Sequence, residues 1–220
     1  MPRVKFKAVL FDLDGTLADT APDLGTALNQ LRREAGLTPL PHQQLRPYTS
    51  AGTRGMLRAG FGVTPDDDAY APLAQRFLHI YAQNLCVNTA VFPALVPVLA
   101  ALEALGLRWG VVTNKPKRFT EPLLRALALA DRCACIVSGD SAAKPKPAPD
   151  PLLLAAEHLV LAPASILYVG DDQRDIQSGT AAGMPTAAAA WGYLGIDSPI
   201  EAWGADWIAH TPSELLDICR

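Results

Sequence analysis

The sequence lacks a hydrophobic run long enough to span a membrane. Its most apolar stretch, Val91–Leu102, is short and contains two prolines, whereas a transmembrane helix needs about 20 consecutive apolar residues. The apolar segment near the N-terminus is also short and ends directly at Asp12. That pattern is not typical of a signal peptide. We therefore expect no membrane partner.

An excess of positive charge is also missing. The chain has 19 lysines and arginines against 22 aspartates and glutamates, a net charge of -3 and a pI of about 5.8. Nucleic-acid binders are usually basic, so no nucleic-acid partner is expected. An anionic substrate would have to be attracted locally, by a metal ion or by a few placed cations.

Cysteine is scarce: the chain contains Cys86, Cys133, Cys135 and Cys219. Their spacing does not match that of a zinc site, and no histidine cluster lies nearby. We expect free, mostly buried thiols, which are typical of a reducing compartment. A cytoplasmic location follows as the expectation.

What the sequence does contain is an alternation of apolar runs and helical patterns. Half of its residues are hydrophobic, as in ordinary globular proteins. The short apolar runs predict buried strands at Lys7–Phe11, Trp109–Val112, Cys133–Val137, Ile166–Val169 and Thr186–Ala189. Helical patterns lie between them at Leu95–Leu105, Glu121–Leu129, Pro151–Leu159 and Asp175–Ala182. Alternating strands and helices predict an α/β fold, a Rossmann-like parallel sheet with helical crossovers.

One long interval breaks this alternation. Between Thr20 and Leu85 no convincing strand occurs, and apolar residues recur at helical spacing in Asp23–Ala35 and Asp66–Leu85. We predict a helical domain, residues 20–87, inserted after the first strand. Residues 1–19 and 88–220 would form the α/β core.

The predicted strand ends carry polar side chains. The first strand ends in Asp12-Leu-Asp14-Gly-Thr16, the second in Thr113-Asn114-Lys115, and the fourth in Gly170-Asp171-Asp-Gln-Arg-Asp175, while Lys144-Pro-Lys146-Pro follows the third. In parallel sheets, ligands bind at the carboxyl ends of the strands. These groups are therefore expected to meet in one site.

Each motif alone has a simpler interpretation. Asp12-x-Asp14-Gly could be a turn or part of a calcium loop. Gly170-Asp-Asp could cap a helix, although a cap does not explain both Asp171 and Asp175. Lys144 and Lys146 each precede a Pro-x-Pro sequence, so the choice between them needs further information.

Together these motifs resemble those of the haloacid dehalogenase superfamily of phosphotransferases, in the same order and over nearly the whole chain. Thr113-Asn-Lys-Pro116 and the run from Lys146 to Pro151 resemble bacterial phosphatases that act on 2-phosphoglycolate. The resemblance identifies the helical insertion as a mobile cap and favours Lys146 over Lys144, because only Lys146 lies at the right distance from Pro151-Leu-Leu-Leu. It implies a magnesium-dependent phosphomonoester hydrolase.

The resemblance also implies roles for individual residues. Asp12 would be the nucleophile that forms an aspartyl-phosphate, Asp14 the general acid and base, and Lys146 the cation that offsets charge. Magnesium would bind Asp12, the backbone oxygen of Asp14, Asp171 and Asp175. The substrate, a small phosphorylated metabolite, would contact Thr113, Asn114 and Lys115.

Asp14 separates reactions within this superfamily. A departing halide needs no proton, whereas the alkoxide released from a phosphate ester does, so Asp14 favours a phosphatase over a dehalogenase. A phosphonate hydrolase would need a cap lysine, and no lysine occurs between Lys7 and Lys115. A β-phosphoglucomutase-like phosphotransferase uses the same two aspartates and stays an alternative. A non-catalytic binding protein on this scaffold would be expected to have lost Asp12, Asp14 or Asp171.

Substrate choice depends on the predicted cap. Ser50–Met56 reads as a glycine-flanked loop that resembles the superfamily's specificity loop, and Arg54 is its only charge. Arg54 could bind a substrate carboxylate, or it could be a solvated surface residue. Phosphoglycolate is the first expected substrate and N-acetylmuramic acid 6-phosphate the alternative, since Trp191-Gly-Tyr193 and Trp203–Asp206 resemble phosphatases for the latter. The sequence does not distinguish a monomer from a homodimer.

Overall fold

The core of the protein is a six-stranded, fully parallel sheet. The computed structural model describes residues 5–220. The strands follow the order β5-β4-β1-β6-β7-β8 across the sheet, with β1 between β4 and β6. Their bounds are Ala8–Phe11 (β1), Arg108–Val112 (β4), Ile136–Val137 (β5), Ile166–Gly170 (β6), Thr186–Ala189 (β7) and Trp207–Ala209 (β8). The predicted Rossmann-like α/β fold is confirmed.

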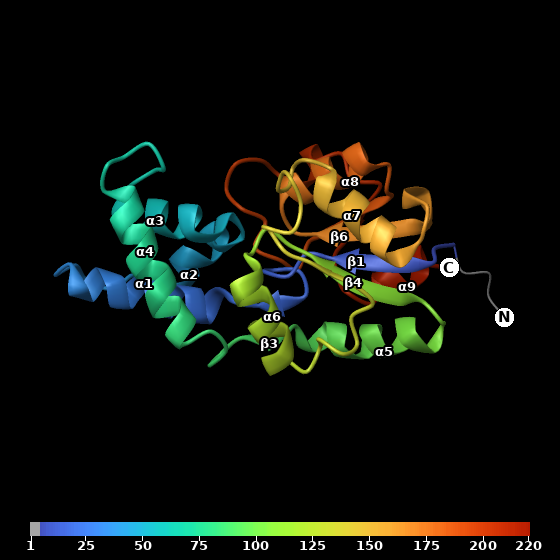
Figure 1. The fold of residues 1–220 in the computed structure, drawn as a ribbon, viewed down its shortest axis with the longest axis horizontal. Helices are drawn as coiled ribbons and strands as arrows, with labels where there is room; N and C mark the ends of the chain where they lie inside the picture. Colours follow the sequence, from blue (N-terminus) through green and yellow to red (C-terminus); the bar gives the residue numbers. More distant parts are fainter. Residues whose placement is uncertain (1–4) are drawn as a thin grey trace.

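Helices cover both faces of this sheet (Figure 1). The elements α7 (Asp150–Leu159) and α8 (Gln173–Ala182) lie on one face, and α5 (Val96–Ala104) and α9 (Glu214–Ile218) lie on the other. Alternate residues of β1 serve the two cores: Val9 and Phe11 join one cluster, and Ala8 and Leu10 the other. Every side chain of a strand that is buried on both faces lies in an apolar core. This explains the unbroken apolar run before Asp12.

The predicted strands agree with the observed ones except at the sheet edges. Cys133–Val137 was too long as a prediction: only Ile136–Val137 forms β5, although Cys135 still accepts a hydrogen bond from Val111. β8 has no counterpart among the predicted strands. It lies at the edge of the sheet and has three residues, of which Trp207 and Ile208 are only partly buried, so its sequence lacks the long apolar run of a central strand.

The inserted residues form a separate group of helices, on the left in Figure 1. These helices have their own apolar cluster, which includes Leu28, Met56 and Phe77. A short antiparallel ribbon, β2 (Ala18–Asp19) with β3 (Ala90–Val91), joins the two ends of the insertion. The bounds are Ala21–Glu34 (α1), His42–Leu45 (α2), Arg46–Ala51 (a 3-10 turn), Gly52–Phe61 (α3) and Tyr70–Gln83 (α4). The domain limits 20–87 stay a prediction, and residues 1–4 lie outside the described part.

Two predictions for the insertion need correction. The helix expected from Asp66 begins at Tyr70, because the Asp67 carboxylate accepts hydrogen bonds from the backbone and hydroxyl of Thr64 and closes a turn. The loop expected at Ser50–Met56 is instead the end of the 3-10 turn and the first residues of α3. Gly55 serves close packing there, since a Cβ would lie 2.1 Å from the Tyr48 carbonyl oxygen.

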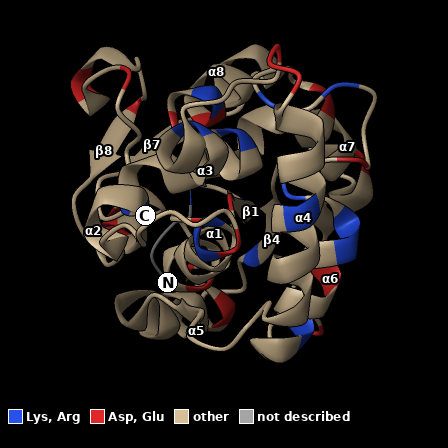
Figure 2. Ribbon diagram, turned by 90° about the vertical axis from the view of Figure 1, so that its left-hand side faces the viewer, with Lys and Arg blue, Asp and Glu red and all other residues tan. Residues whose placement is uncertain are grey.

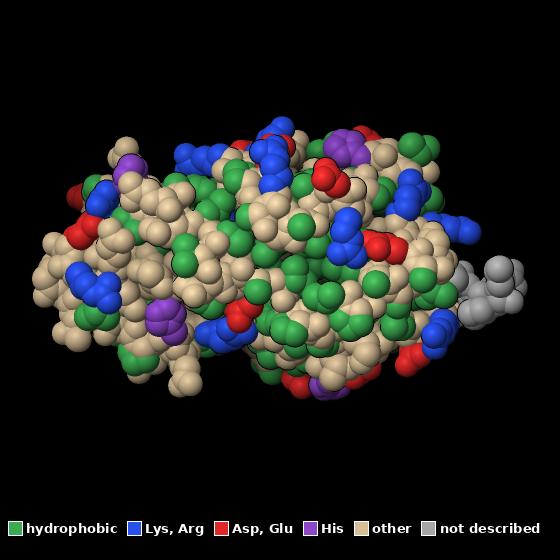
Figure 3. Space-filling model, turned by 90° about the horizontal axis from the view of Figure 1, so that it is seen from below, with side chains coloured by type: hydrophobic (Ala, Val, Ile, Leu, Met, Phe, Trp, Pro, Cys, Tyr) green, Lys and Arg blue, Asp and Glu red, His purple; other side chains and the backbone are tan. Residues whose placement is uncertain are grey.

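One predicted core helix also begins earlier than expected. The element α6 spans Lys117–Ala126 rather than starting at Glu121, and Pro116 precedes it with an extended backbone. Positions of basic and acidic residues are interspersed along the ribbon when the molecule is seen from the end that carries the insertion (Figure 2). On the face around α5 and α6, hydrophobic side chains alternate with charged ones (Figure 3). No helix within residues 5–220 has the length and apolarity needed to cross a bilayer.

Candidate active site

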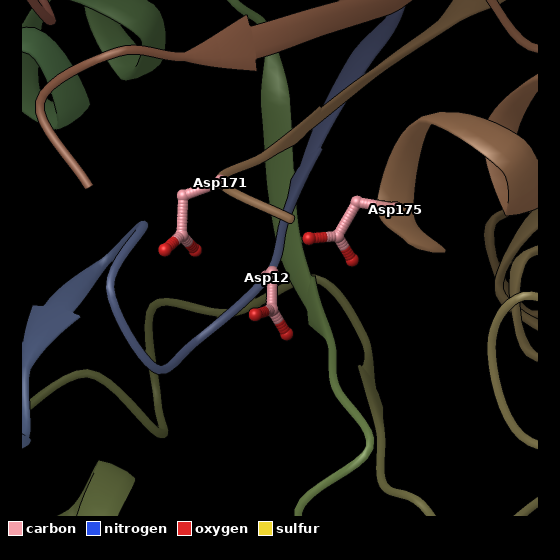
Figure 4. Close-up of side chains that lie close together, drawn as sticks. All are labelled: Asp12, Asp171 and Asp175. Carbon is pink, nitrogen blue, oxygen red and sulfur yellow. The ribbon is translucent and has the colours of Figure 1, made fainter. Parts of the chain in front are cut away.

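Three buried carboxylates converge at the carboxyl end of the sheet. Asp12 follows β1, Asp171 follows β6, and Asp175 lies in the first turn of α8. One oxygen from each lies within 4.8 Å of the others, and the three side chains point toward a common space (Figure 4). The neighbouring positions of β1 and β6 in the sheet bring together residues that are far apart in the sequence.

Lys146 crosses to this cluster from the loop before α7. Its ammonium donates to Asp12 Oδ1 at 2.8 Å, to Asp175 Oδ1 at 2.6 Å, to the Tyr168 hydroxyl at 2.9 Å and to the Val112 carbonyl at 3.1 Å. Burial opposes the lysine's charge, but attraction to the two aspartates outweighs it and raises the pKa of Lys146 to about 12. Lys144, the other candidate, is exposed.

The cluster gathers more carboxylates than cations. The Lys146 ammonium pairs with Asp12 and Asp175, whereas Asp171 accepts hydrogen bonds only from neutral hydroxyl and backbone groups. Burial, together with repulsion from neighbouring carboxylates, raises the pKa of Asp12 to about 6, and burial with repulsion from Asp12 and Asp175 raises the pKa of Asp171 to about 8. A bound cation would relieve both effects.

Asp171 is held by groups from three parts of the chain. Its Oδ1 accepts from the Thr16 hydroxyl at 2.7 Å, and its Oδ2 accepts from the Tyr193 backbone at 2.8 Å and from the Ser50 hydroxyl at 3.0 Å. Gly15 makes this approach possible: it has a φ of +93°, and a Cβ there would lie 2.3 Å from Asp171 Oδ2. Gly15 is therefore needed for two reasons: its backbone adopts a positive φ in the turn, and it leaves room for the Asp171 carboxylate.

The start of α8 combines capping with the acidic cluster. Asp172 is the N-cap residue and accepts from the Arg174 backbone, while Asp175 Oδ2 accepts from the Asp172 backbone at 3.1 Å. The helix-cap interpretation of Gly170-Asp-Asp thus applies to Asp172. It does not apply to Asp171, whose carboxylate turns to the cluster instead.

Asp14 lies apart from the three clustered carboxylates. Its Oδ1 accepts from the Thr20 hydroxyl at 2.6 Å and from the Lys115 ammonium at 2.9 Å. Burial opposes the charge of Lys115, but attraction to Asp14 and Tyr81 keeps its pKa above the ordinary value. The predicted metal contact of Asp14 was through its backbone oxygen, and that stays a prediction.

The end of β4 provides two further predicted residues. Thr113 is buried, and its hydroxyl accepts from the Lys115 backbone at 3.2 Å. The Asn114 side chain donates to the Lys146 carbonyl and accepts from the Lys146 backbone, both at 2.9 Å. Asn114 therefore holds the lysine loop in place, and one of its amide hydrogens is left for the predicted contact with a phosphoryl oxygen.

The insertion closes these groups into a cavity of about 270 Å³. Asp12, Asp14, Lys115 and Lys146 line its core side, and Ser50 and Tyr81 line its cap side. Arg174 fixes the contact between the two sides: it forms an ion pair with Asp172 and donates to the Ser50 carbonyl at 2.8 Å. The described structure is therefore one in which the insertion lies closed on the sheet end.

Arg54, the predicted specificity residue, does not line this cavity. It is exposed on α3 and lines a neighbouring cavity of about 380 Å³ together with Arg58 and Trp203. The two cavities share Ala51, Asp172 and Arg174, so they meet at the cap–core contact. A role for Arg54 in substrate binding stays a prediction, and it now requires a substrate that extends beyond the first cavity.

Residues 9–189 match the family of haloacid dehalogenase-like hydrolases. The chain belongs to this family. The predicted resemblance is therefore confirmed, and the hydrolase's carboxylate cluster lies within the matched residues.

Close relatives of this hydrolase bear the names of phosphatases. N-acetylmuramic acid 6-phosphate phosphatase from Pseudomonas aeruginosa is 44% identical over 99% of this chain and 96% of its own length. Phosphoglycolate phosphatase from Xanthomonas campestris is 43% identical over 95% of this chain and 94% of its own. The crystal structure of a predicted phosphoglycolate phosphatase from Haemophilus somnus has a TM-score of 0.85 at 28% identity, covering 98% of this chain and 99% of that one. These names agree with the predicted class, phosphoric monoester hydrolase.

Sequence reasoning missed several residues of the hydrolase's site. Tyr168 lies inside a buried strand, where an aromatic residue is expected for packing alone, yet its hydroxyl also donates to Asp175 at 3.0 Å. Arg174 lies within the fourth motif but at a position without an expected role. The spacing of Tyr81 places it on the apolar face of a cap helix, where a packing role is expected. For the two tyrosines, a packing pattern concealed the polar group.

Proposed function

We propose that this protein is a magnesium-dependent phosphomonoester hydrolase and that its preferred substrate is 2-phosphoglycolate. The reaction proceeds through an aspartyl-phosphate on Asp12. The observation that carries the proposal is the sheet-end cluster, in which three buried carboxylates converge and the Lys146 ammonium pairs with two of them, Asp12 and Asp175. Family membership and the names of relatives support it. A cytoplasmic location remains a prediction.

The donor set fits a hard divalent cation. All three groups are carboxylates, and magnesium prefers oxygen ligands from few carboxylates, carbonyls and substrate phosphate. A divalent cation would also offset the mutual repulsion of the three carboxylates, of which Lys146 pairs only two. Asp12, Asp171 and Asp175 would hold it, with the Asp14 backbone oxygen as the fourth predicted contact, and bound magnesium would lower the repulsion between the nucleophile and the phosphate.

The first chemical step forms a new bond between a carboxylate oxygen of Asp12 and phosphorus. The bond between phosphorus and the ester oxygen breaks, and its electron pair leaves with that oxygen, which takes a proton from Asp14. Lys146 fixes the orientation of Asp12 through Oδ1. Thr113 and Asn114 line the space for the phosphoryl oxygens. The products of this step are the alcohol and the aspartyl-phosphate.

The second step returns the enzyme to its starting state. Asp14, now a carboxylate, removes a proton from water, and the water oxygen bonds to phosphorus while the bond to Asp12 breaks. Inorganic phosphate leaves. Lys115, 2.9 Å from Asp14, holds this carboxylate in position beside the cavity.

A second candidate is hydrolysis of N-acetylmuramic acid 6-phosphate. The neighbouring 380 Å³ cavity favours it, because a large leaving group could extend past Ala51 and Arg174 into that space. The 44% identical relative with this name supports the same candidate. A β-phosphoglucomutase-like transfer between sugar hydroxyls is the third and least favoured possibility.

A substrate panel tests the proposal. Phosphate release from 2-phosphoglycolate, N-acetylmuramic acid 6-phosphate and glucose 1-phosphate is compared by kcat/KM, with magnesium and with excess chelator. We expect magnesium-dependent release that is fastest with 2-phosphoglycolate. A higher kcat/KM for the amino-sugar phosphate would select the second candidate, and full activity in excess chelator would reject the metal assignment.

A further inference from the structure

Tyr81 carries a hydroxyl group with no partner in the described structure. The side chain comes from α4 of the insertion, is 1% exposed, and lines the same cavity as Asp12 and Asp14. Among residues 5–220, its hydroxyl is the one buried side-chain polar atom without a hydrogen-bond partner. A buried hydroxyl without a partner is unfavourable, and this one belongs to a residue that lines the cavity where a substrate would bind.

The surroundings of Tyr81 position it beside the predicted leaving group. The Lys115 ammonium lies 4.7 Å from the centre of the Tyr81 ring and donates to Asp14 at 2.9 Å. Asp14 is the residue proposed to protonate the leaving oxygen. A group attached one carbon beyond that oxygen would therefore lie near the Lys115 ammonium, on the side of the site where Tyr81 packs.

The rest of this wall is apolar. Leu24, Leu78 and Phe119 line the cavity around Tyr81, and the Phe119 ring packs against the Tyr81 ring with centroids 5.6 Å apart. A sugar presents several hydroxyl groups that each need a polar partner. One ammonium and one hydroxyl against an apolar wall instead match the two oxygens of a single carboxylate.

We infer that Tyr81 and Lys115 form a carboxylate clamp, in which the hydroxyl and the ammonium bind the acid group of a small phosphorylated hydroxy acid next to its ester oxygen. The inference rests on the proposed phosphatase function and names the substrate class of the same site. It assigns specificity to the part of the cavity lined by Tyr81 and Lys115.

Tyr81→Phe tests the clamp, because it removes only the hydroxyl. The measured quantity is the ratio of kcat/KM for 2-phosphoglycolate to that for ethyl phosphate, which has a methyl group in place of the carboxylate. We expect this ratio to fall roughly tenfold, which corresponds to about 1.4 kcal/mol. The melting temperature should stay equal or rise, because an unsatisfied buried group is lost. Tyr70→Phe, at the start of the same helix and outside the cavity lining, should leave the ratio unchanged.

A binding measurement separates the clamp from the proposed function. Calorimetry with 2-phosphoglycolate compares Asp12→Asn with Asp12→Asn/Tyr81→Phe in the presence of magnesium, so that no turnover is needed. Roughly tenfold weaker binding in the double variant supports the clamp even if the wild type hydrolyses a different ester faster. Equal affinities, an unchanged selectivity ratio, or a lower melting temperature in Tyr81→Phe would overturn it. Absence of hydrolysis with every ester would reject only the phosphatase proposal.

Discussion

The sheet end and the underside of the insertion face the same cavity, but their polar groups are satisfied to different degrees. At the sheet end, Lys146 alone makes four hydrogen bonds, and Asp171 accepts three. On the insertion, the Tyr81 hydroxyl has no partner in the described structure, and Arg54 and Arg58 lie exposed. The sheet-end side chains have hydrogen-bond partners without a substrate, whereas the Tyr81 hydroxyl of the insertion does not.

This difference fits a division between reaction and recognition. Groups that stabilise a reacting phosphoryl group work best when they are fixed before the substrate arrives. Groups that select a substrate gain from having no other partner, because the substrate then supplies the missing contact. Changes at the sheet end should therefore affect all phosphate esters, and changes on the insertion should affect particular ones.

The largest expected effect is at the sheet end. Asp12→Asn keeps the shape of the side chain but removes the attacking carboxylate, so kcat should fall by several orders of magnitude for every ester in steady-state assays. Asp68→Asn, which changes an exposed carboxylate of the insertion, serves as the matched control. Turnover of Asp12→Asn near the wild-type rate would show that the sheet end does not supply the nucleophile.

An intermediate effect is expected on the insertion. Arg54→Ala should lower kcat/KM for N-acetylmuramic acid 6-phosphate by roughly ten- to a hundredfold, from a lost charge-assisted contact of about 1.5–3 kcal/mol. 2-Phosphoglycolate should be affected less, since Arg54 lines only the neighbouring cavity. Arg33→Ala, an exposed arginine of α1, is the control. Equal losses for both esters would show that Arg54 does not select substrates.

The smallest expected effect is on stability. Burial and mutual repulsion raise the pKa of Asp12 to about 6 and that of Asp171 to about 8, above the value near 4 of an unfolded aspartate. The folded metal-free protein therefore binds more protons than the unfolded chain between about pH 4 and pH 8, and its stability falls as the pH rises through that window.

Thermal unfolding in excess chelator measures this effect. The melting temperature should fall by several degrees from pH 5 to pH 8, and magnesium should restore more stability at pH 8 than at pH 5, because protons compete with the cation. Asp171→Asn should flatten the dependence. A melting temperature that rises with pH in the metal-free protein would contradict the raised pKa values.

Much of the fold could be predicted because the central strands are buried on both faces. Their unbroken apolar runs, such as Ala8–Phe11 and Ile166–Gly170, have few alternatives. The edges could not be predicted as well: β5 and β8 are short and partly buried, and the β2–β3 ribbon has two residues in each strand. Such elements depend on tertiary pairing rather than on a local pattern.

The site divides in the same way. Asp12, Asp171 and Asp175 could be expected to meet because topology brings the ends of parallel strands together. The contacts of the insertion could not be predicted, because they depend on how the inserted helices close on the sheet end. Ser50 reaching Asp171, Arg54 lying outside the first cavity, and the unpartnered Tyr81 hydroxyl all follow from that closure.

The measurement that tests the central claim most directly is the location of a trapped phosphoryl group. Asp14→Asn is mixed with p-nitrophenyl phosphate, whose leaving group needs little protonation, and is quenched rapidly in acid. Because hydrolysis of the intermediate needs the Asp14 base, the account predicts that mass spectrometry finds one phosphoryl group on the peptide of Asp12, at Asp12 itself. A burst of nitrophenol without a phosphorylated protein, or a phosphoryl group on a residue such as Ser50 or Thr113, would contradict it.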